Sequence, residues 1–477
     1  MAAFDKVNSD FLAWLEANGA TVSKSIELQD YSAEGAGRGV VAVADINKDE
    51  ELFSIPRPLL LSPETSALAQ KIDLTTLEGW NPLMMCMIYE YCRGSESHWK
   101  PYFDILPEEF STPMFWSNEE LEELAGTGII DKIGREEAEA VFKEMLWPLI
   151  SANLEVFSAQ GKDEAAFMKI FHRMGSLIMA YAFHDTLPGK DEDEDMDDDE
   201  DEEEEEEKVN VSMVPMADML NHRTGHNNAR LFHEKDCLRM VAIKPIKNGQ
   251  QIYNTYGDLC NAGKALDSRT VASDLNRTVQ RQHLLRKYGF VDVPNPHNIA
   301  EISGESVLAK FTTADEEGED EKVEWLLEHE GLEDFFILET DGDIPEDLVG
   351  CAKILMMPIQ EFKKTVLEAK KLPNTKLTVE VQKLLRELLE ARLAEYTTTA
   401  KEDKALLKQT QDTLSVNKRN AVLVRSEERE IIQSVLDQVK KWRPPVPAPS
   451  ATSSTGKRKG NTKGQHPNKG KKPYQKK

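Results

Sequence analysis

The chain has 477 residues, 40% of them hydrophobic, and is therefore long enough for two or three domains with separate cores. Sixteen of its 85 acidic residues lie in 191–207 and the other 69 face 58 basic residues, so the formal charge of −27 falls to −11 outside that run. A mildly acidic folded body repels the phosphate backbone of nucleic acids, so we expect no nucleic-acid binding through it. Only a basic tail could provide such binding.

Five cysteines are scattered along the chain without a C-x-x-C pair, at Cys86, Cys92, Cys237, Cys260 and Cys351. This spacing argues against a disulfide framework and a zinc cluster, so we predict no bound metal and a reducing compartment. The N-terminus lacks a basic patch followed by an apolar stretch, and no run of about eighteen apolar residues occurs. We therefore expect a soluble intracellular protein with no membrane partner.

An N-terminal helix is expected within 1–25, followed by strands at 40–43 and 51–55 that glycine and charged turns separate. Apolar residues at mixed three- and four-residue spacing then predict three helices. These helices cover 82–92, 136–157 and 167–183. Strand character returns at 211–216, 237–246 and 251–253. The pattern predicts a β-rich unit that a helical insertion divides into two parts.

The last third of the chain is predicted to form a separate helical domain, because leucines recur at heptad-like spacing between 346 and 441 with charges on the outer face. Beyond it, the proline- and serine-rich linker and basic tail of 442–477 are expected to be disordered. The acidic run, taken as 191–208, carries too much like charge to pack, and we interpret it as a solvated loop. A tolerated insertion is the plain interpretation of that loop, and a regulatory or histone-binding role is the alternative.

Polar residues that directly follow an apolar run mark the first candidate site. Asn221 and His222 end such a run, where burial would demand hydrogen-bond partners for both. A satisfied structural pair is the plain alternative, and metal ligation by His222, His226 and His233 lacks a carboxylate or cysteine to complete the set. Gly-Arg-Gly at 37–39, this Asn-His pair, and the later Tyr-Gly pairs at 256–257 and 288–289 would rarely occur together by chance.

On these motifs the chain resembles the SET-domain methyltransferases, in particular the split-SET branch that includes Rubisco large-subunit methyltransferase. Within that branch it is similar to the group of SET domain-containing protein 6 and the fungal ribosomal lysine N-methyltransferases. The resemblance runs from Phe11 to about Lys441, and its most specific fragments are MAYAF, MADMLNH, CLRMVAIKPIKNGQQIYNTYG and LLRKYGF.

The resemblance implies an α+β fold in which a β-rich SET domain of small, pseudoknot-like sheets is split by a helical insertion. The SET parts would be 26–80 and 209–292, and the insertion 81–190. An all-α substrate-binding domain like that of Rubisco methyltransferase would follow at 300–441. The implied activity is S-adenosylmethionine-dependent transfer of a methyl group to a lysine of a protein substrate.

Site residues are carried over from the same resemblance. The backbone of Ala36, Gly37 and Arg38 would contact the cofactor, because glycine lets the main chain approach a ligand closely. The other implied cofactor contacts are Tyr181, Asn221, His222 and Tyr288. Trp80 and Asp218, the latter expected on a strand, match positions that touch the substrate peptide or its lysine. Core packing for Tyr181 and domain packing for Trp80 remain the alternatives.

Tyr256 is the implied catalytic residue and would also contact the substrate. The lysine nitrogen, methyl carbon and sulfur must be held in line at about 3 Å, and the Tyr256 hydroxyl would orient the amine. Supplying a neutral lysine at pH 7 costs roughly 4–5 kcal/mol, and desolvation beside the sulfonium lowers that cost. A buried tyrosine hydrogen-bonded in a strand is the alternative for this position.

An insert of roughly twenty residues at about 263–282 departs from the family pattern and far exceeds the usual loop length of about 4 to 6 residues. It is either a surface loop or a retained intron, since Gly-Lys at its start and Val-Gln near its end are compatible with splice sequences. A real loop would affect how Tyr288 reaches the site.

The expected acceptor is a lysine of a non-histone protein, either a ribosomal protein or a nuclear regulator. Histidine methylation, a catalytically degenerate SET-fold binding module and an acidic chaperone are the alternatives. The basic tail, with Lys457, Arg458 and Lys459, indicates nuclear import or RNA contact, so we expect the protein in nucleus and cytoplasm.

Overall fold

The computed structural model describes residues 2–32, 36–158, 161–185, 210–223, 225–254, 281–293, 295–312, 319–410 and 413–444. The predicted acidic loop, the tail beyond 444, nearly all of the predicted insert, and Tyr256 lie outside the described residues. Among the helices described, none is long and apolar enough to cross a lipid bilayer.

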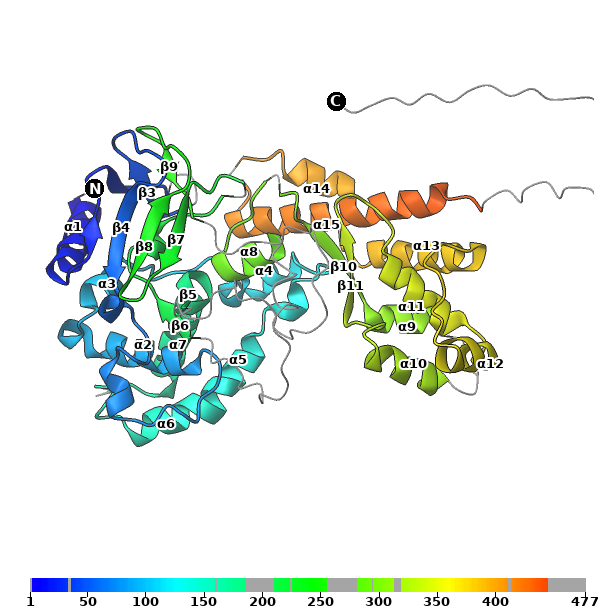
Figure 1. Ribbon diagram of the computed structural model, residues 1–477, viewed down its shortest axis with the longest axis horizontal. Coiled ribbons are helices and arrows are strands. Elements are labelled where there is room, and N and C mark those ends of the chain that lie inside the picture. The colour runs from blue at the N-terminus through cyan, green and yellow to red at the C-terminus, as the bar shows by residue number, and fades with distance from the viewer. Residues whose placement is uncertain are drawn as a thin grey trace, which may run out of the picture.

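Two small antiparallel sheets lie beside the N-terminal helix α1 (Ala2–Ala17), at the left of Figure 1. One sheet has the strand order β1-β4-β8-β7 and the other β2-β3-β9. The strands are β1 (Thr21–Val22), β2 (Ile26–Asp30), β3 (Arg38–Ala42), β4 (Glu51–Pro56), β7 (Ala229–His233), β8 (Cys237–Ala242) and β9 (Gln251–Ile252). Each sheet joins segments about 200 residues apart, which confirms the predicted division of one β-rich unit by an insertion.

Strand β8 shows why this unit is a sheet with one face on the core. Leu238, Met240 and Ala242 are buried and alternate with half-buried neighbours, the two-residue period of a strand. On the other face Arg239 donates to Glu51 at 2.6 Å and to Glu234 at 2.7 Å. The predicted strand ran to 246, but the chain turns after Ala242.

The insertion is helical, as predicted, and lies below the sheets in Figure 1. Its helices are α2 (Asn81–Arg93), α3 (Lys100–Ile105), α4 (Asn118–Glu122), α5 (Arg135–Val141), α6 (Trp147–Ala152) and α7 (Glu164–Tyr181). A π-helical turn, Phe142–Leu146, joins α5 to α6. The predicted helix ran to 157 but ends at Ala152, because Asn153 leaves helical geometry and its side-chain amide donates to the Leu149 carbonyl at 2.9 Å.

Helix α7 leads directly into the second part of the β-rich unit. It begins at Asp163, whose carboxylate accepts the Ala166 N–H as an N-cap. The helix was predicted to reach Phe183, but 182–185 form strand β5 (Ala182–Asp185) because they pair with β6 (Asn210–Met213). Strand β6 ends three residues before the predicted Met216. The prediction that Asp218 lies on a strand is wrong, since it lies in the 3-10 turn Ala217–Met219 that follows Pro215.

The C-terminal region lies at the right in Figure 1 and is mainly helical, as predicted. Its helices are α8 (Arg281–Tyr288), α9 (Gly304–Phe311), α10 (Glu319–Glu328), α11 (Glu346–Met356), α12 (Ile359–Phe362), α13 (Val379–Ala394), α14 (Ala400–Leu406) and α15 (Val416–Lys441). The all-α expectation missed one antiparallel pair, β10 (Ile299–Ser303) with β11 (Phe335–Glu339). Four of the five β10 residues are buried, so the strand shows no alternation in its sequence.

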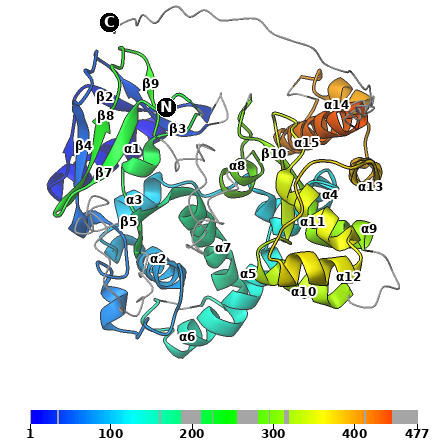
Figure 2. The same cartoon turned by 45° about the vertical axis from the view of Figure 1, so that its right-hand side comes forward.

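Separate cores fill the SET-and-insertion half and the C-terminal region, and a small third cluster joins them. That cluster brings Trp116, Leu124 and Ile129 of the insertion against Leu285 of α8 and Val424 of α15. Figure 2 shows α15 and α14 standing above the other C-terminal helices on the side away from the sheets.

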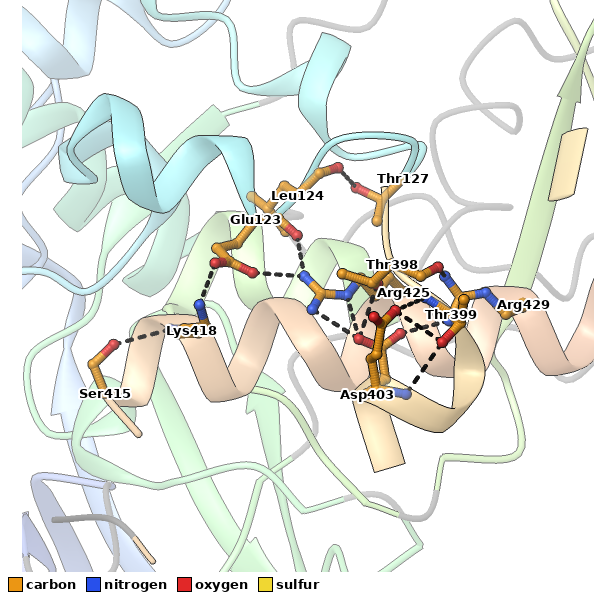
Figure 3. Close-up of polar contacts among 11 residues, drawn as sticks. Glu123, Leu124, Thr127, Thr398, Thr399, Asp403, Ser415, Lys418, Arg425 and Arg429 are labelled. Atoms are coloured by element: carbon orange, nitrogen blue, oxygen red, sulfur yellow. Dashed lines mark hydrogen bonds and ion pairs between the residues drawn. The ribbon is translucent and has the colours of Figure 1, made fainter. Parts of the chain in front are cut away.

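Buried charges complete the same junction (Figure 3). Arg425 donates to Asp403 at 2.9 Å and to Glu123 of the insertion at 2.9 Å, and Arg429 donates to Asp403 at 2.5 Å. Lys418 adds an ion pair to Glu123 at 2.5 Å. Because a buried charge is tolerated only when it is paired, this network fixes the C-terminal region against the insertion.

Candidate functional site

A close approach of three segments surrounds Gly39 in strand β3. A Cβ at Gly39 would lie 2.6 Å from Asn221 Nδ2, 2.6 Å from Gln251 Nε2 and 2.8 Å from the Tyr31 ring, so a larger residue would displace these side chains. Both of these amide nitrogens are buried, and neither has a hydrogen-bond partner in the part of the chain that the structure describes. Buried donors are normally paired, so these two unpaired amides are candidate donors to a polar ligand.

The loop that precedes Gly39 is tight and faces open space. The Tyr31 N–H donates to the Gly37 carbonyl at 2.5 Å, and the Ala36 N–H donates to the Tyr31 carbonyl at 3.2 Å. Gly37 has a φ of +64°, which favours glycine, and nothing lies within 4 Å of where its Cβ would be. Tyr31 thus links Ala36 and Gly37, two of the predicted backbone contacts, to the place where the unpaired amides meet Gly39.

Arg38 has a structural side chain. Its guanidinium donates to Asn8 of α1 at 3.0 Å and to the carbonyl of Ile105, the last residue of α3, at 2.7 Å. Burial lowers the pKa of Arg38 below its usual value, and Asp30 and Tyr181 oppose that shift. The side chain thus ties strand β3 to the helices, and only the Arg38 backbone remains for the predicted ligand contact.

Asn221 and His222 lie where the turn after β6 meets β9. The Asn254 N–H donates to the Asn221 carbonyl at 3.1 Å, and Asn221 forms a parallel bridge with Tyr253. This main-chain pairing holds the Asn221 amide against Gly39. Burial lowers the pKa of His222, although Asp292 and the Asn254 backbone raise it, so the ring is neutral at physiological pH. The described chain stops at Asn254, two residues before Tyr256.

A buried polar cluster lies in the same region and consists of Tyr102, Tyr181 and Asp218. The Tyr102 hydroxyl donates to Asp218 Oδ2, joining α3 to the turn before Asn221. Burial raises the pKa of Asp218 to about 7, although the Tyr102 hydroxyl and the Asp218 and Met216 N–H groups lower it. Burial also raises the pKa of Tyr181 to about 12, with a contribution from Asp218 that Arg38 partly offsets.

Tyr288 ends helix α8 next to this cluster. Burial raises its pKa, and Tyr181 adds to the shift, so the two predicted cofactor residues are neighbours. The following Gly289 has a φ of +76°, and its carbonyl accepts from Ser111 at 3.1 Å and from Asn420 at 3.3 Å. The corner that carries Tyr288 is therefore held by the insertion and by α15 together.

Trp80 lies at the start of α2 and is 38% exposed. Trp80 belongs to none of the hydrophobic clusters of the described residues, and the domain-packing alternative stays open. No interaction joins Trp80 to Asp218 or to the tyrosines within the described residues, so the structure does not bring it to the cluster.

Comparisons with known proteins show the family of the chain. The family model of the SET domain matches 37–257, and that of the Rubisco LSMT substrate-binding domain matches 314–432. The chain is 30% identical to "N-lysine methyltransferase SETD6" of Mus musculus over 462 residues, which cover 90% of this chain and 89% of that protein. The human SETD6 is 29% identical over 439 residues, 84% of each chain. The chain belongs to the SETD6 family of N-lysine methyltransferases.

Solved structures give the same fold at lower identity. The SET domain of LSMT bound to lysine and AdoHcy aligns with a TM-score of 0.66 at 20% identity, over 91% of both chains. The structure of Rubisco LSMT bound to AdoMet aligns with a TM-score of 0.65 at 19% identity, again over 91% of both. The α+β SET fold with a helical substrate-binding domain is thereby confirmed.

As a SETD6-family member the chain is a protein-lysine N-methyltransferase that uses S-adenosylmethionine. The residues around Gly39 fit this cofactor, because its carboxylate and ring nitrogens need donors and the unpaired Asn221 and Gln251 amides can supply them. Open space before Gly37 leaves room for it.

Three residues of the site escaped the sequence analysis: Gly39, Gln251 and Tyr102. Gly39 and Gln251 stand inside motifs that were recognised, Gly-Arg-Gly and KNGQQIY, so the signal for them was present. Tyr102 stands in a short helix with no motif and meets Asp218, which is 116 residues away in sequence, only through the fold.

Proposed function

We propose that this SETD6-family enzyme methylates a lysine of a basic, non-histone protein, a ribosomal protein or a nuclear regulator, with its cofactor held at Gly39. The observation that supports the site most strongly is the pair of amides, Asn221 Nδ2 and Gln251 Nε2, that have no partner among the described residues and lie around a glycine whose Cβ would displace them. The acidic body supports a basic acceptor, because a charge of −11 outside the acidic run attracts positively charged proteins.

Each residue has a stated role in this proposal. The Asn221 and Gln251 amides and the backbone of 36–39 hold the cofactor, and Tyr181, His222 and Tyr288 line its site. S-adenosylmethionine, when bound, supplies a methyl group on a positively charged sulfur. Asp218 and Trp80 contact the substrate, and Tyr256 orients the lysine amine for attack. The role of Tyr256 stays a prediction from the resemblance, since the residue lies outside those described.

The lysine must be neutral when it attacks the methyl group, and the surroundings of Asp218 suit that need. Taking an ammonium out of water lowers its pKa, because burial disfavours the charged form. Asp218, Tyr102 and Tyr181 are all buried or nearly so, and the pKa shifts of all three are dominated by desolvation. A lysine entering beside them loses hydration and, with it, much of its preference for the charged state.

Incubation of the purified full chain with tritium-labelled S-adenosylmethionine and two acceptor pools, proteins of isolated eukaryotic ribosomes and a nuclear extract, tests the proposal. We expect discrete labelled bands, and mass spectrometry should place the methyl group on lysine. The Tyr256→Phe variant is the control and should lose most of the labelling while still binding the cofactor. Label on histidine would support the alternative acceptor, and blank lanes with tight protein binding would support a degenerate binding module.

For localisation we propose nucleus and cytoplasm, on the basic residues Lys457, Arg458 and Lys459. Fluorescence of the tagged full chain should divide between the two compartments. Replacing these three residues by alanine should leave only the cytoplasmic signal, and an unchanged distribution would contradict the proposal.

A further inference from the structure

Asp218 is the buried carboxyl of the site, and one of its oxygens is left without a side-chain partner. The residue is 5% exposed, and Oδ2 accepts the Tyr102 hydroxyl. No side chain among the described residues donates to Oδ1, and no Lys or Arg in that part of the chain forms an ion pair with the carboxyl. A buried carboxylate oxygen in this state is poised to receive a donor from outside the protein.

We propose that Asp218 Oδ1 accepts a proton from the substrate lysine ammonium and that Tyr102, by holding Oδ2, is the positioning residue that aims it. This inference rests on the proposed function, which places the substrate lysine beside Asp218. The lysine ammonium first pairs with the Asp218 carboxylate. A hydrogen-bonded ion pair in a water-poor site then collapses to a neutral pair, because desolvation disfavours both charges.

The proton balance of this step is simple. One N–H bond of the ammonium breaks, its electron pair stays on lysine Nζ, and an O–H bond forms on Asp218. Methyl transfer then places a positive charge on the methylated amine, and the sulfur becomes neutral. Asp218 returns its proton to solvent when the product leaves, so the carboxylate is restored for the next cycle.

Of Tyr102, Tyr181 and Asp218, Asp218 is the residue suited to accept the lysine proton, because of the groups that face it. Tyr102 faces it from α3, Tyr181 from α7 and the N–H groups of Met216 and Asp218 from its own turn, and Arg38 of β3 acts on Tyr181. Both tyrosines remain protonated near neutral pH, because burial raises the pKa of Tyr181 to about 12 and that of Tyr102 well above its usual value. Asp218, with a pKa of about 7, changes its protonation in the working range.

The roles of Asp218 and Tyr102 are tested by measuring the initial rate of methylation from about pH 5 to about pH 9. The assay uses labelled S-adenosylmethionine and whichever acceptor protein the wild type labels. The wild-type rate should rise with pH through an acid limb near 7, where Asp218 ionises. Tyr102→Phe removes a hydrogen bond that lowers the Asp218 pKa. The acid limb of the Tyr102→Phe profile should therefore move up by about one pH unit. At alkaline pH the methylation rate of this variant should approach that of the wild type. Asp218→Asn should lose the limb and turn over about 100-fold more slowly.

Matched controls separate this role from a structural one. Tyr396→Phe removes the same kind of bond, from a buried tyrosine to the carboxyl of Glu428, in the C-terminal region and should leave the acid limb where it is. Calorimetry should find S-adenosylmethionine affinity unchanged in the Tyr102 and Asp218 variants. If Tyr102→Phe does not fold, Asp218→Asn carries the test.

The inference is overturned if the limb of Tyr102→Phe stays in place, if Tyr396→Phe moves it equally, if Asp218→Asn keeps wild-type turnover, or if cofactor affinity falls in either site variant. A wild type that labels no acceptor is a different result, because it contradicts the proposed function itself and the inference falls with it.

Discussion

Two buried tyrosine–carboxyl pairs in the described part of the chain differ in what surrounds them. Tyr102 donates to Asp218 in the cofactor region, and Tyr396 donates to Glu428 at 2.9 Å in the junction between the C-terminal region and the insertion. Burial raises the pKa of both carboxyls to about 7. The same tyrosine–carboxyl pair therefore occurs once in the region proposed to bind the cofactor and once where two parts of the protein pack together.

The difference lies in the other partners of each carboxyl. Glu428 Oε1 also accepts the Gly128 N–H at 3.3 Å, and Glu428 Oε2 lies 3.6 Å from the Arg392 guanidinium, so a cation compensates its negative charge. Asp218 has no such cation among the described residues. A compensated buried charge holds two parts of a protein together, whereas an uncompensated one invites a proton or a cationic ligand.

The largest effect is expected where a substitution removes the cation that pairs with a buried carboxylate. Arg425→Ala removes the cation that pairs with both Asp403 and Glu123, and Asp403 is fully buried. We expect a loss of about 3–5 kcal/mol in the free energy of unfolding, measured by urea denaturation, because a buried carboxylate is left with too few partners. Lys418→Ala, which removes the half-exposed partner of the same Glu123, should cost less than about 1 kcal/mol. Equal losses would contradict the view that burial of Arg425 determines its contribution.

The next effect is expected in the cofactor region. Gly39→Ala introduces a Cβ 2.6 Å from the amide nitrogens of Asn221 and Gln251, so both side-chain amides must move to admit it. We expect S-adenosylmethionine affinity, measured by calorimetry, to fall by about 100-fold or more, because two hydrogen bonds to the ligand are displaced. Gly175→Ala in α7 is the control, since its Cβ would meet only the flexible end of Met84 at 3.2 Å. Undiminished affinity in Gly39→Ala would remove the cofactor from this place.

The pH dependence of stability compares the two carboxyls directly. The folded-state pKa of Glu428 is raised from 4.5 to about 7, so the folded protein holds a proton that the unfolded chain releases. The resulting stabilisation is complete below about pH 4.5 and is lost as the pH rises through about 7. Glu428→Gln should therefore flatten the fall in unfolding free energy between these values, by an amount on the order of 3 kcal/mol.

Asp218→Asn should flatten the same fall in stability, because its folded-state pKa is raised from 3.8 to about 7 by the same cause. Only Asp218→Asn should also change the acid limb of the methylation rate. A matching change of that limb in Glu428→Gln would show that both carboxyls act on activity through folding, and the contrast between the two pairs would disappear.

Part of the fold and of the candidate site was visible in the sequence, for identifiable reasons. The helix ending at Tyr181 followed from its apolar periodicity, and Asn221 and Tyr288 followed from motifs. The strand Ile299–Ser303 was missed because neighbours cover nearly all of it and suppress its two-residue period. Asp218 was assigned to a strand because the apolar run before it continues through Val214, but Pro215 and the positive φ of Met216 turn the chain. Pairings such as Tyr102 with Asp218 or Arg425 with Glu123 depend on tertiary contacts and have no local signal.

The smallest effect is expected at Trp80, which is exposed at the start of α2 and contacts none of the described residues of the cluster around Asp218 by a hydrogen bond or ring contact. An exposed tryptophan at a substrate contact contributes to binding of the acceptor and not to the chemical step. Trp80→Ala should raise the KM for the labelled acceptor protein by about three- to tenfold and leave kcat and S-adenosylmethionine affinity unchanged. Phe232→Ala, at another exposed aromatic residue on strand β7, is the matched control and should leave KM unchanged. If both variants behave alike, Trp80 is an ordinary surface residue, and the substrate contacts of this region are confined to the buried cluster around Asp218.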